Sequence, residues 1–174
     1  MEPVMDVRSF RQALGQFPTG VCVVTSTIGA EKLGVTISSF NSLSLNPPLI
    51  LFSIDRRAAS LSQWAEAEGY AINVLSENQA DLSSRFSKPL SNKWEGIACE
   101  TIVGHGIVLP GAAAVFHCAP WAAHDGGDHL LFIGRVTSFQ SFWDRRPLVF
   151  SKGRYAALES ERHNEASWPL AMHY

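Results

Sequence analysis

Apolar residues recur along this chain at two spacings, which together predict a few short helices among many strands. Helical spacing of three or four residues comes first, at Val7, Phe10, Leu14 and Phe17. Asp6 precedes this stretch in the position of an N-cap, and Pro18 stops it. The pattern therefore predicts an amphipathic helix over residues 6–17.

Two further helices are predicted in the middle of the chain. Residues 57–68 are helical in composition and end at Gly69, a residue type suited to the C′ position. Ser76 and Gln79 have the spacing of a capping box, so a short helix is predicted over residues 76–86.

Runs of β-branched and apolar residues predict strands that are mostly joined by short turns. The strand segments are residues 20–27, 33–40, 49–54, 70–75, 112–121, 129–139 and 147–158, with weaker pairing around 98–103. Residues 28–32 read as a hairpin turn, and the glycine-rich residues 122–128 connect two long strands, 112–121 and 129–139. Many hairpin-linked strands with two or three helices indicate a mainly β barrel or sandwich. An alternating βαβ sheet does not fit this order.

Composition and charge suit one globular domain. The 174 residues are 46% apolar and 17% charged, with a net charge of −2 and a pI of about 6.3, so no nucleic-acid surface is expected. Cys22, Cys99 and Cys118 form no CxxC motif, which predicts reduced thiols and a cytoplasmic location. No signal peptide or membrane-length apolar run is expected. We predict a single domain over residues 1–174, with a core over about 10–158 and a C-terminal tail over 159–174.

A run of hydroxyl side chains in the segment GVTISSFNSLSLNPPLI, residues 34–50, is the first candidate site. On a strand, Thr36 and Ser38 share one face, and Ser39 comes where the strand gives way to a turn. Such hydroxyls and nearby backbone N–H groups can bind a phosphate, with Arg85 supplying a full positive charge. The alternative is an ordinary solvent-exposed strand face, and composition alone leaves both open.

The second candidate is His129, which follows the turn Gly127–Asp128 and begins an apolar strand. An Asp in the loop can fix such an imidazole, which then orients a ligand or exchanges a proton. A plain turn histidine is the alternative. Trp94, Trp121 and Tyr155 lie in loop-like segments and offer rings on which a planar ligand can stack.

Several familiar motifs are absent. The chain has no GxGxxG fingerprint at a strand–helix junction, no Walker A motif and no GxSxG elbow. His, Cys and Asp residues are dense over 117–129, but they lack zinc-type spacing, and neighbouring strand residues such as His117 and Cys118 face opposite sides. We expect no metal site.

Five segments in this order resemble the flavin reductases of the split-barrel type, the small reductase components of two-component flavin monooxygenases. They are FPTGVCVVTS (17–26), GVTISSFNSLSLNPPLILFSI (34–54), YAINVLSENQADLSSRFS (70–87), GDHLLFIGRV (127–136) and LVFSKGRY (148–155). The resemblance runs from about Phe10 to Leu158. It implies a six-stranded antiparallel split barrel of Greek-key topology, working as a homodimer, and it favours the anion-binding reading of the hydroxyl segment.

The resemblance also assigns roles to residues. It implies a catalytic His129 near a nicotinamide and a set of flavin-binding residues: Thr36, Ile37, Ser38, Ser39, Ser53, Ser60, Arg85 and Tyr155. Ser60 is flanked by DRRAA, which departs from the family's usual asparagine-containing pattern.

The activity implied is hydride transfer from NADH or NADPH to FMN or FAD, with the reduced flavin supplied to a separate monooxygenase. The protein's task is then to stack two rings, because the cofactor supplies the difficult chemistry. Two alternatives stay open: a reductase that holds FMN tightly and reduces another acceptor such as a corrinoid, and a non-catalytic flavin- or haem-binding split-barrel module.

Overall fold

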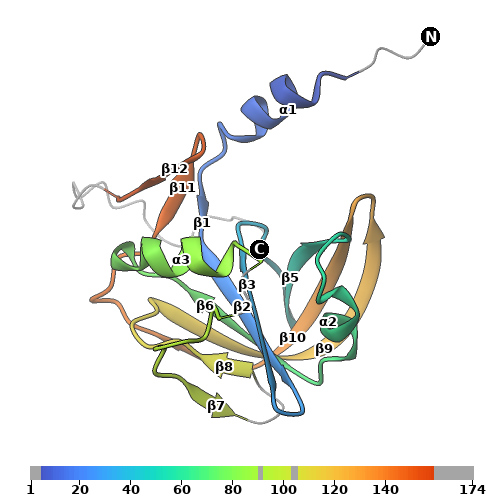
Figure 1. The fold of residues 1–174 in the computed structure, drawn as a ribbon, viewed down its shortest axis with the longest axis vertical. Helices are drawn as coiled ribbons and strands as arrows, with labels where there is room; N and C mark the ends of the chain where they lie inside the picture. Colours follow the sequence, from blue (N-terminus) through green and yellow to red (C-terminus); the bar gives the residue numbers. More distant parts are fainter. Residues whose placement is uncertain (1–4, 90–91, 103–105, 159–174) are drawn as a thin grey trace.

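The structure is a computed structural model that describes residues 5–89, 92–102 and 106–158. Seven strands form one antiparallel sheet in the order β3-β2-β6-β9-β10-β5-β4 (Figure 1). Their bounds are β2 (Cys22–Ile28), β3 (Glu31–Ile37), β4 (Asn41–Leu45), β5 (Pro48–Asp55), β6 (Tyr70–Val74), β9 (Ala114–Gly126) and β10 (His129–Ser141). The predicted tail over residues 159–174 lies outside the described residues.

Two smaller sheets and four helical segments complete the described chain. The small sheets contain β1 (Thr19–Gly20), β11 (Val149–Ser151) and β12 (Arg154–Ala156), and β7 (Glu100–Ile102) with β8 (Gly106–Val108). The helical segments are α1 (Val7–Leu14), α2 (Leu61–Glu66), the 3₁₀ turn Glu77–Gln79 and α3 (Ala80–Phe86). No helix in the described ranges is long and apolar enough to cross a membrane.

The main sheet curls so that strands far apart in its order meet. The hydroxyl of Ser39, just after β3, accepts a hydrogen bond from Ser53 N of β5 at 3.0 Å and donates to Ser53 O at 3.3 Å. β3 and β5 are first and sixth in the sheet, so these bonds link the two sides of a barrel. The predicted mainly β barrel is therefore confirmed.

The strand count differs from the six expected, because β4 adds a seventh strand to the main sheet. The segment NSLSL pairs with β5 across a turn that contains the cis peptide bond Asn46–Pro47. Its serines and its largely exposed leucines made it read as a polar connection. The connection between β9 and β10 is also shorter than predicted, since both strands continue to a two-residue turn at Gly127 and Asp128.

Helices form at all three predicted places, but the first ends at Leu14 and not at Phe17, and the second is also shorter than predicted. The carboxylate of Asp6 accepts from Arg8 N and Ser9 N and caps α1, and the Ser76–Gln79 capping box is formed. The second helix is shorter than residues 57–68: α2 begins at Leu61, and Ala67 is already extended, so the helix ends before Gly69. Burial of Ala67 in the barrel core accompanies this early end.

Aromatic side chains fill the barrel interior. The Phe52 and Phe132 rings stack with centroids 5.2 Å apart, and Tyr70 meets Phe52 edge-on at 5.3 Å. Trp64 of α2 packs into the same cluster and is almost fully buried. A second cluster, containing Phe86, lies beneath α3. The strands that carry the candidate site are thus backed by a packed core.

Two buried polar side chains attach β8 to the main sheet. Asn73 Oδ1 accepts from Leu109 N at 2.8 Å, and its Nδ2 donates to Ile107 O at 3.1 Å. Thr25 Oγ1 accepts from Ile107 N at 2.9 Å. Both side chains are fully buried. Because these bonds satisfy backbone groups that β8 cannot pair within its own two-stranded sheet, they stabilise the junction.

Helix α1 stands away from the barrel, beside the β11–β12 hairpin (Figure 1). It has the predicted amphipathic pattern, yet none of its residues is buried. Val7 is 63% exposed, Phe10 48% and Leu14 57%. The apolar stripe of α1 therefore has no cover within the described chain.

Candidate functional site

A cleft of about 740 Å³ opens beside β3, the end of β5 and the start of α2. It brings together seven of the nine residues predicted from sequence: Thr36, Ile37, Ser38, Ser39, Ser53, Ser60 and His129. These residues come from four separate segments of the chain. Their meeting in one hollow follows from the curl of the sheet, which carries the end of β3 to β5.

The three hydroxyls at the end of β3 differ in what they can still bind. Thr36 Oγ1 donates to Ser83 O of α3 at 2.7 Å, and Ser39 is engaged with Ser53. Within the described part of the chain, the exposed Ser38 hydroxyl makes no hydrogen bond. A hydroxyl has one donor, so Ser38 is the side chain here with a donor left for an anion. Thr36 and Ser39 instead fix the backbone on either side of it.

Ser60 is held at the N-terminal boundary of α2. It occupies the N-cap position without a side-chain capping bond, and its hydroxyl accepts from Trp64 Nε1 at 3.1 Å. Since Trp64 is buried in the core, this bond fixes the Ser60 side chain relative to the barrel. Ser60 thus reaches the cleft from a rigid support.

His129 also lines the cleft, at the first residue of β10, where it pairs with Asp55 at the end of β5. Its Nδ1 is 2.7 Å from Asp128 Oδ1, the contact anticipated from the loop sequence. The hydrogen bond to His129, followed by the charge of the imidazole, lowers the pKa of Asp128. A carboxylate on Nδ1 leaves Nε2 as the nitrogen available to a ligand.

The turn that carries His129 is fastened to the end of β5. Arg56 N donates to Asp128 O at 2.9 Å, Arg56 Nε donates to Gly127 O at 3.0 Å, and its guanidinium pairs with Asp125. Next to it, hydrogen bonds from Arg57 hold the pKa of Asp55 well below its usual range. Both arginines are therefore matched by carboxylates, and the imidazole stands on a fixed turn.

Arg85 and Tyr155 do not line the cleft. The exposed Arg85 donates from Nη1 to Glu95 O at 2.8 Å. Tyr155 OH donates to Ser83 Oγ at 2.9 Å. The backbone oxygen of the same Ser83 accepts the hydrogen bond from Thr36. The expected guanidinium is thus turned to another partner, and Tyr155 supports the site from the side of α3.

Sequence reasoning missed the cations that do line the cleft. Lys88 and Lys93 are among the residues that line it, as is Trp94, whose ring packs edge-on against Phe86 at 4.8 Å. Trp94 was singled out as a ring for stacking, but neither lysine was. They lie in an irregular segment rich in Gly and Pro, where no periodicity tells which side chains turn inward.

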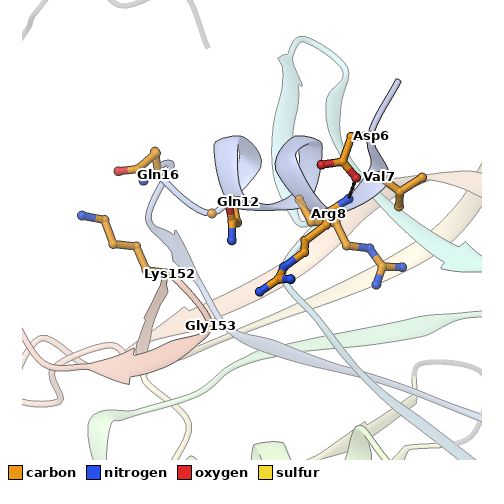
Figure 2. A pocket seen from close by; sticks show the side chains of 9 residues that line it. Asp6, Val7, Arg8, Gln12, Gln16, Lys152 and Gly153 are labelled. Carbon is orange, nitrogen blue, oxygen red and sulfur yellow. Dashed lines mark hydrogen bonds between the residues drawn. The ribbon is translucent and has the colours of Figure 1, made fainter. Parts of the chain in front are cut away.

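A second hollow, of about 800 Å³, lies between α1 and the β11–β12 turn. Figure 2 shows Gln12 of α1 and Gln16, which follows the helix, on one side and Lys152 on the other. None of the predicted site residues lines it. This second hollow is lined in part by α1, the helix whose apolar residues are exposed.

Comparison with known proteins assigns the chain. A family described as flavin reductase like domain matches residues 14–159. The chain belongs to this flavin reductase-like family. Its relatives include an FMN reductase (NADH), SmoA, of Agrobacterium fabrum, which is 42% identical over 155 residues, covering 88% of this chain and 87% of that protein.

Two other members of the flavin reductase-like family extend the comparison. The reductase subunit HsaB of a flavin-dependent monooxygenase from Rhodococcus jostii is 36% identical over 165 residues, 94% of this chain and 84% of HsaB. The structure of an NADH:FAD oxidoreductase, SgcE6, of Streptomyces globisporus with NAD and FAD fragments superposes with a TM-score of 0.86. It shares 30% identity and covers 93% of this chain and 99% of its own. The family and fold class predicted from sequence are confirmed.

Proposed function

We propose that this chain is an NAD(P)H-dependent flavin reductase that passes reduced FMN or FAD to a separate monooxygenase. The names of its relatives support a flavin and a nicotinamide as the two nucleotides, and several relatives are reductase subunits of monooxygenases. The observation that carries the proposal is the cleft itself, where hydroxyl residues of β3 and an oriented imidazole face one hollow.

The residues of the cleft fit a flavin nucleotide. Its volume lies within the range of about 300–1,000 Å³ that is typical of small-molecule sites. Ser38 and the backbone at the end of β3 offer donors for a phosphate, while Ile37 and Trp94 offer apolar surface for a ring. A bound flavin supplies the hydride acceptor, and the protein's part is to hold and orient it.

His129 acts on the nicotinamide side. Asp128 fixes its ring through Nδ1, and Arg56 fixes the turn beneath it. The imidazole can then hydrogen-bond the nicotinamide or its ribose through Nε2 and hold the two rings in stacking distance. Such positioning accounts for most of the rate, since the chemistry needs few acid–base groups.

We also propose that the protein is a homodimer in which the stripe of α1 packs on a second copy. An amphipathic helix that buries none of its own apolar residues needs a cover, and residues this exposed are unusual in a monomer.

A cytoplasmic setting agrees with the three free thiols. Burial raises the pKa of both Cys22 and Cys118 to about 12, so neither is a thiolate at neutral pH.

A crossed assay tests the proposed function. Oxidation of NADH or NADPH is followed at 340 nm with added FMN, FAD or no flavin, and the absorbance spectrum of the purified protein is recorded first. We expect turnover that depends on added flavin and bleaching of the flavin without oxygen. Absence of flavin-dependent turnover with both nicotinamides would contradict the proposal. Stoichiometric flavin that survives gel filtration would favour a reductase with tightly held FMN.

A further inference from the structure

We propose that residues 92–97 form a strap along the cleft, held closed by Arg85 and Trp94, and that its opening admits and releases the flavin. This proposal rests on the proposed function, because it concerns how a flavin exchanges at the same cleft. It makes Arg85 a positioning residue, which acts on the ligand without touching it.

The strap is not built into any sheet or helix. Its backbone hydrogen bonds are local turns: Glu95 N donates to Asn92 O at 3.0 Å, and Ile97 N donates to Trp94 O at 3.3 Å. Within the described chain, no backbone–backbone hydrogen bond joins residues 92–97 to another element. Such a segment can separate from its neighbours without breaking a strand or a helix, so its opening costs little of the stability of the whole fold.

Two side chains of the strap bind carbonyls of β3, the outermost strand on one side of the main sheet. Trp94 Nε1 donates to Lys32 O at 3.0 Å, and Lys93 Nζ donates to Gly34 O at 3.2 Å. The Trp94 ring also packs edge-on against Phe86. This close approach requires glycine at position 34, since a Cβ there would lie 2.5 Å from the Phe86 ring and 2.9 Å from Trp94 Cζ2. The strap therefore rests directly on the strand.

Arg85 ties the strap to α3. Its Nη1 donates to Glu95 O at 2.8 Å. The guanidinium is exposed, pairs with no carboxylate among the described residues and does not line the cleft. An effect of Arg85 on a bound flavin must therefore pass through the strap. This separates Arg85 from Trp94, which holds the strap and also lines the cleft.

Opening of the strap would change the cleft without dismantling it. Lys93 and Trp94 are the strap's contribution to the lining. Ser38 and His129 make no hydrogen bond with the strap in the described structure, so an opened strap leaves them in place. Opening of such segments often sets the rate at which a product leaves an enzyme. A reductase that hands its flavin to another protein needs this kind of exit, and a closed strap keeps the lining intact while the hydride moves.

Stopped-flow binding of FMN and riboflavin, followed by flavin fluorescence, tests the strap. The unaltered chain is compared with Arg85→Met and with a control, Arg154→Met, which changes an exposed arginine of β12 outside the cleft. Loss of one exposed hydrogen bond should shift the opening equilibrium about two- to tenfold. Arg85→Met should therefore raise the association and dissociation rate constants of both flavins by about two- to tenfold, with each Kd within about threefold. Arg154→Met should change neither rate constant.

Other outcomes overturn the strap. Faster dissociation of FMN alone, with riboflavin unchanged, would show that the Arg85 guanidinium binds the phosphate directly. Faster dissociation of both flavins without faster association would make residues 92–97 a fixed wall. Unchanged rate constants in Arg85→Met would show that the strap does not open during binding. Binding of neither flavin to the unaltered chain would instead defeat the proposed function, so the two failures are distinct.

Two more variants and hydrogen exchange guard against misfolding of Arg85→Met. Arg85→Lys keeps a donor for Glu95 O and should restore rate constants close to those of the unaltered chain. Trp94→Phe keeps an aromatic ring but loses the bond to Lys32 O, so it should also speed association. By mass spectrometry, the amides of residues 92–97 should exchange with deuterium faster in Arg85→Met than in the unaltered chain. Equal exchange of these amides in the two chains, or slower association in Trp94→Phe, would contradict the strap.

Discussion

Two adjacent serines at the end of β3 should fail in different ways when truncated. Ser39→Ala removes the hydroxyl that accepts from Ser53 N at 3.0 Å and donates to Ser53 O at 3.3 Å. Ser38→Ala removes a hydroxyl that is exposed and makes no bond within the described chain. The same chemical change is thus made at a structural bond and at a proposed binding position.

The magnitude for Ser39 follows from the bonds it makes. A half-buried Ser53 N–H left without its partner costs about 1–3 kcal/mol in the free energy of unfolding. For a domain of this size, each kcal/mol corresponds to a shift in Tm of about 2–4 °C. Ser39→Ala should therefore lower Tm by about 2–12 °C. Ser38→Ala should leave the free energy of unfolding within about 0.5 kcal/mol of the parent, as is usual for a surface residue.

The assays are thermal and urea unfolding followed by far-UV circular dichroism, together with titration of FMN. Ser38→Ala should raise the Kd for FMN about tenfold or more, the loss expected for a hydrogen bond to a charged acceptor. Equal destabilisation by both variants would refute the reasoning that the Ser39 hydroxyl stabilises the fold while the Ser38 hydroxyl binds the ligand. So would a Ser39→Ala protein as stable as the parent.

Three further changes test other parts of the structure. Asn73→Ala leaves the buried Leu109 N–H unpaired and should lower the free energy of unfolding in urea by about 2–4 kcal/mol. A decrease below about 1 kcal/mol would contradict the buried network. Asn41→Ala on exposed β4 is the matched control. His129→Ala should raise KM for the nicotinamide or slow flavin reduction in stopped flow, with the Kd for flavin nearly unchanged. If KM and the reduction rate both stay the same, His129 does not act on the nicotinamide. Phe10→Asp should convert the proposed dimer to a monomer in analytical ultracentrifugation, and an unchanged mass would refute packing through α1.

The β architecture could be predicted because its signals are local. Alternating and β-branched runs marked most of the strands, and the capping residues Asp6, Ser76 and Gln79 lie where the helices need them. β4 was not predicted because its five residues, mostly exposed and with serine at two of them, carry little periodic signal. Its pairing is decided by the turn that follows it and by β5.

The site was predictable to the extent that it lies on strands. Thr36 and His129 belong to strands, and Ser38 and Ser39 directly follow β3, so the register that the sequence implies is enough to place them. Arg85 does not line the cleft because helix phase decides its direction: Ser83 and Phe86 share the buried face of α3, and Arg85 lies off that face. Lys93 was missed because its direction depends on a tertiary contact with the edge of β3.

The two side chains that cover the edge of β3 have a consequence for solubility. An outer strand with unpaired carbonyls and amides is a template on which another molecule can add a strand and begin aggregation. Over the seven residues of β3 that template would be about 23 Å long. Trp94 and Lys93 occupy the carbonyls of Lys32 and Gly34 along it. The protein thereby protects itself from edge-to-edge polymerisation with the same segment that walls its cleft.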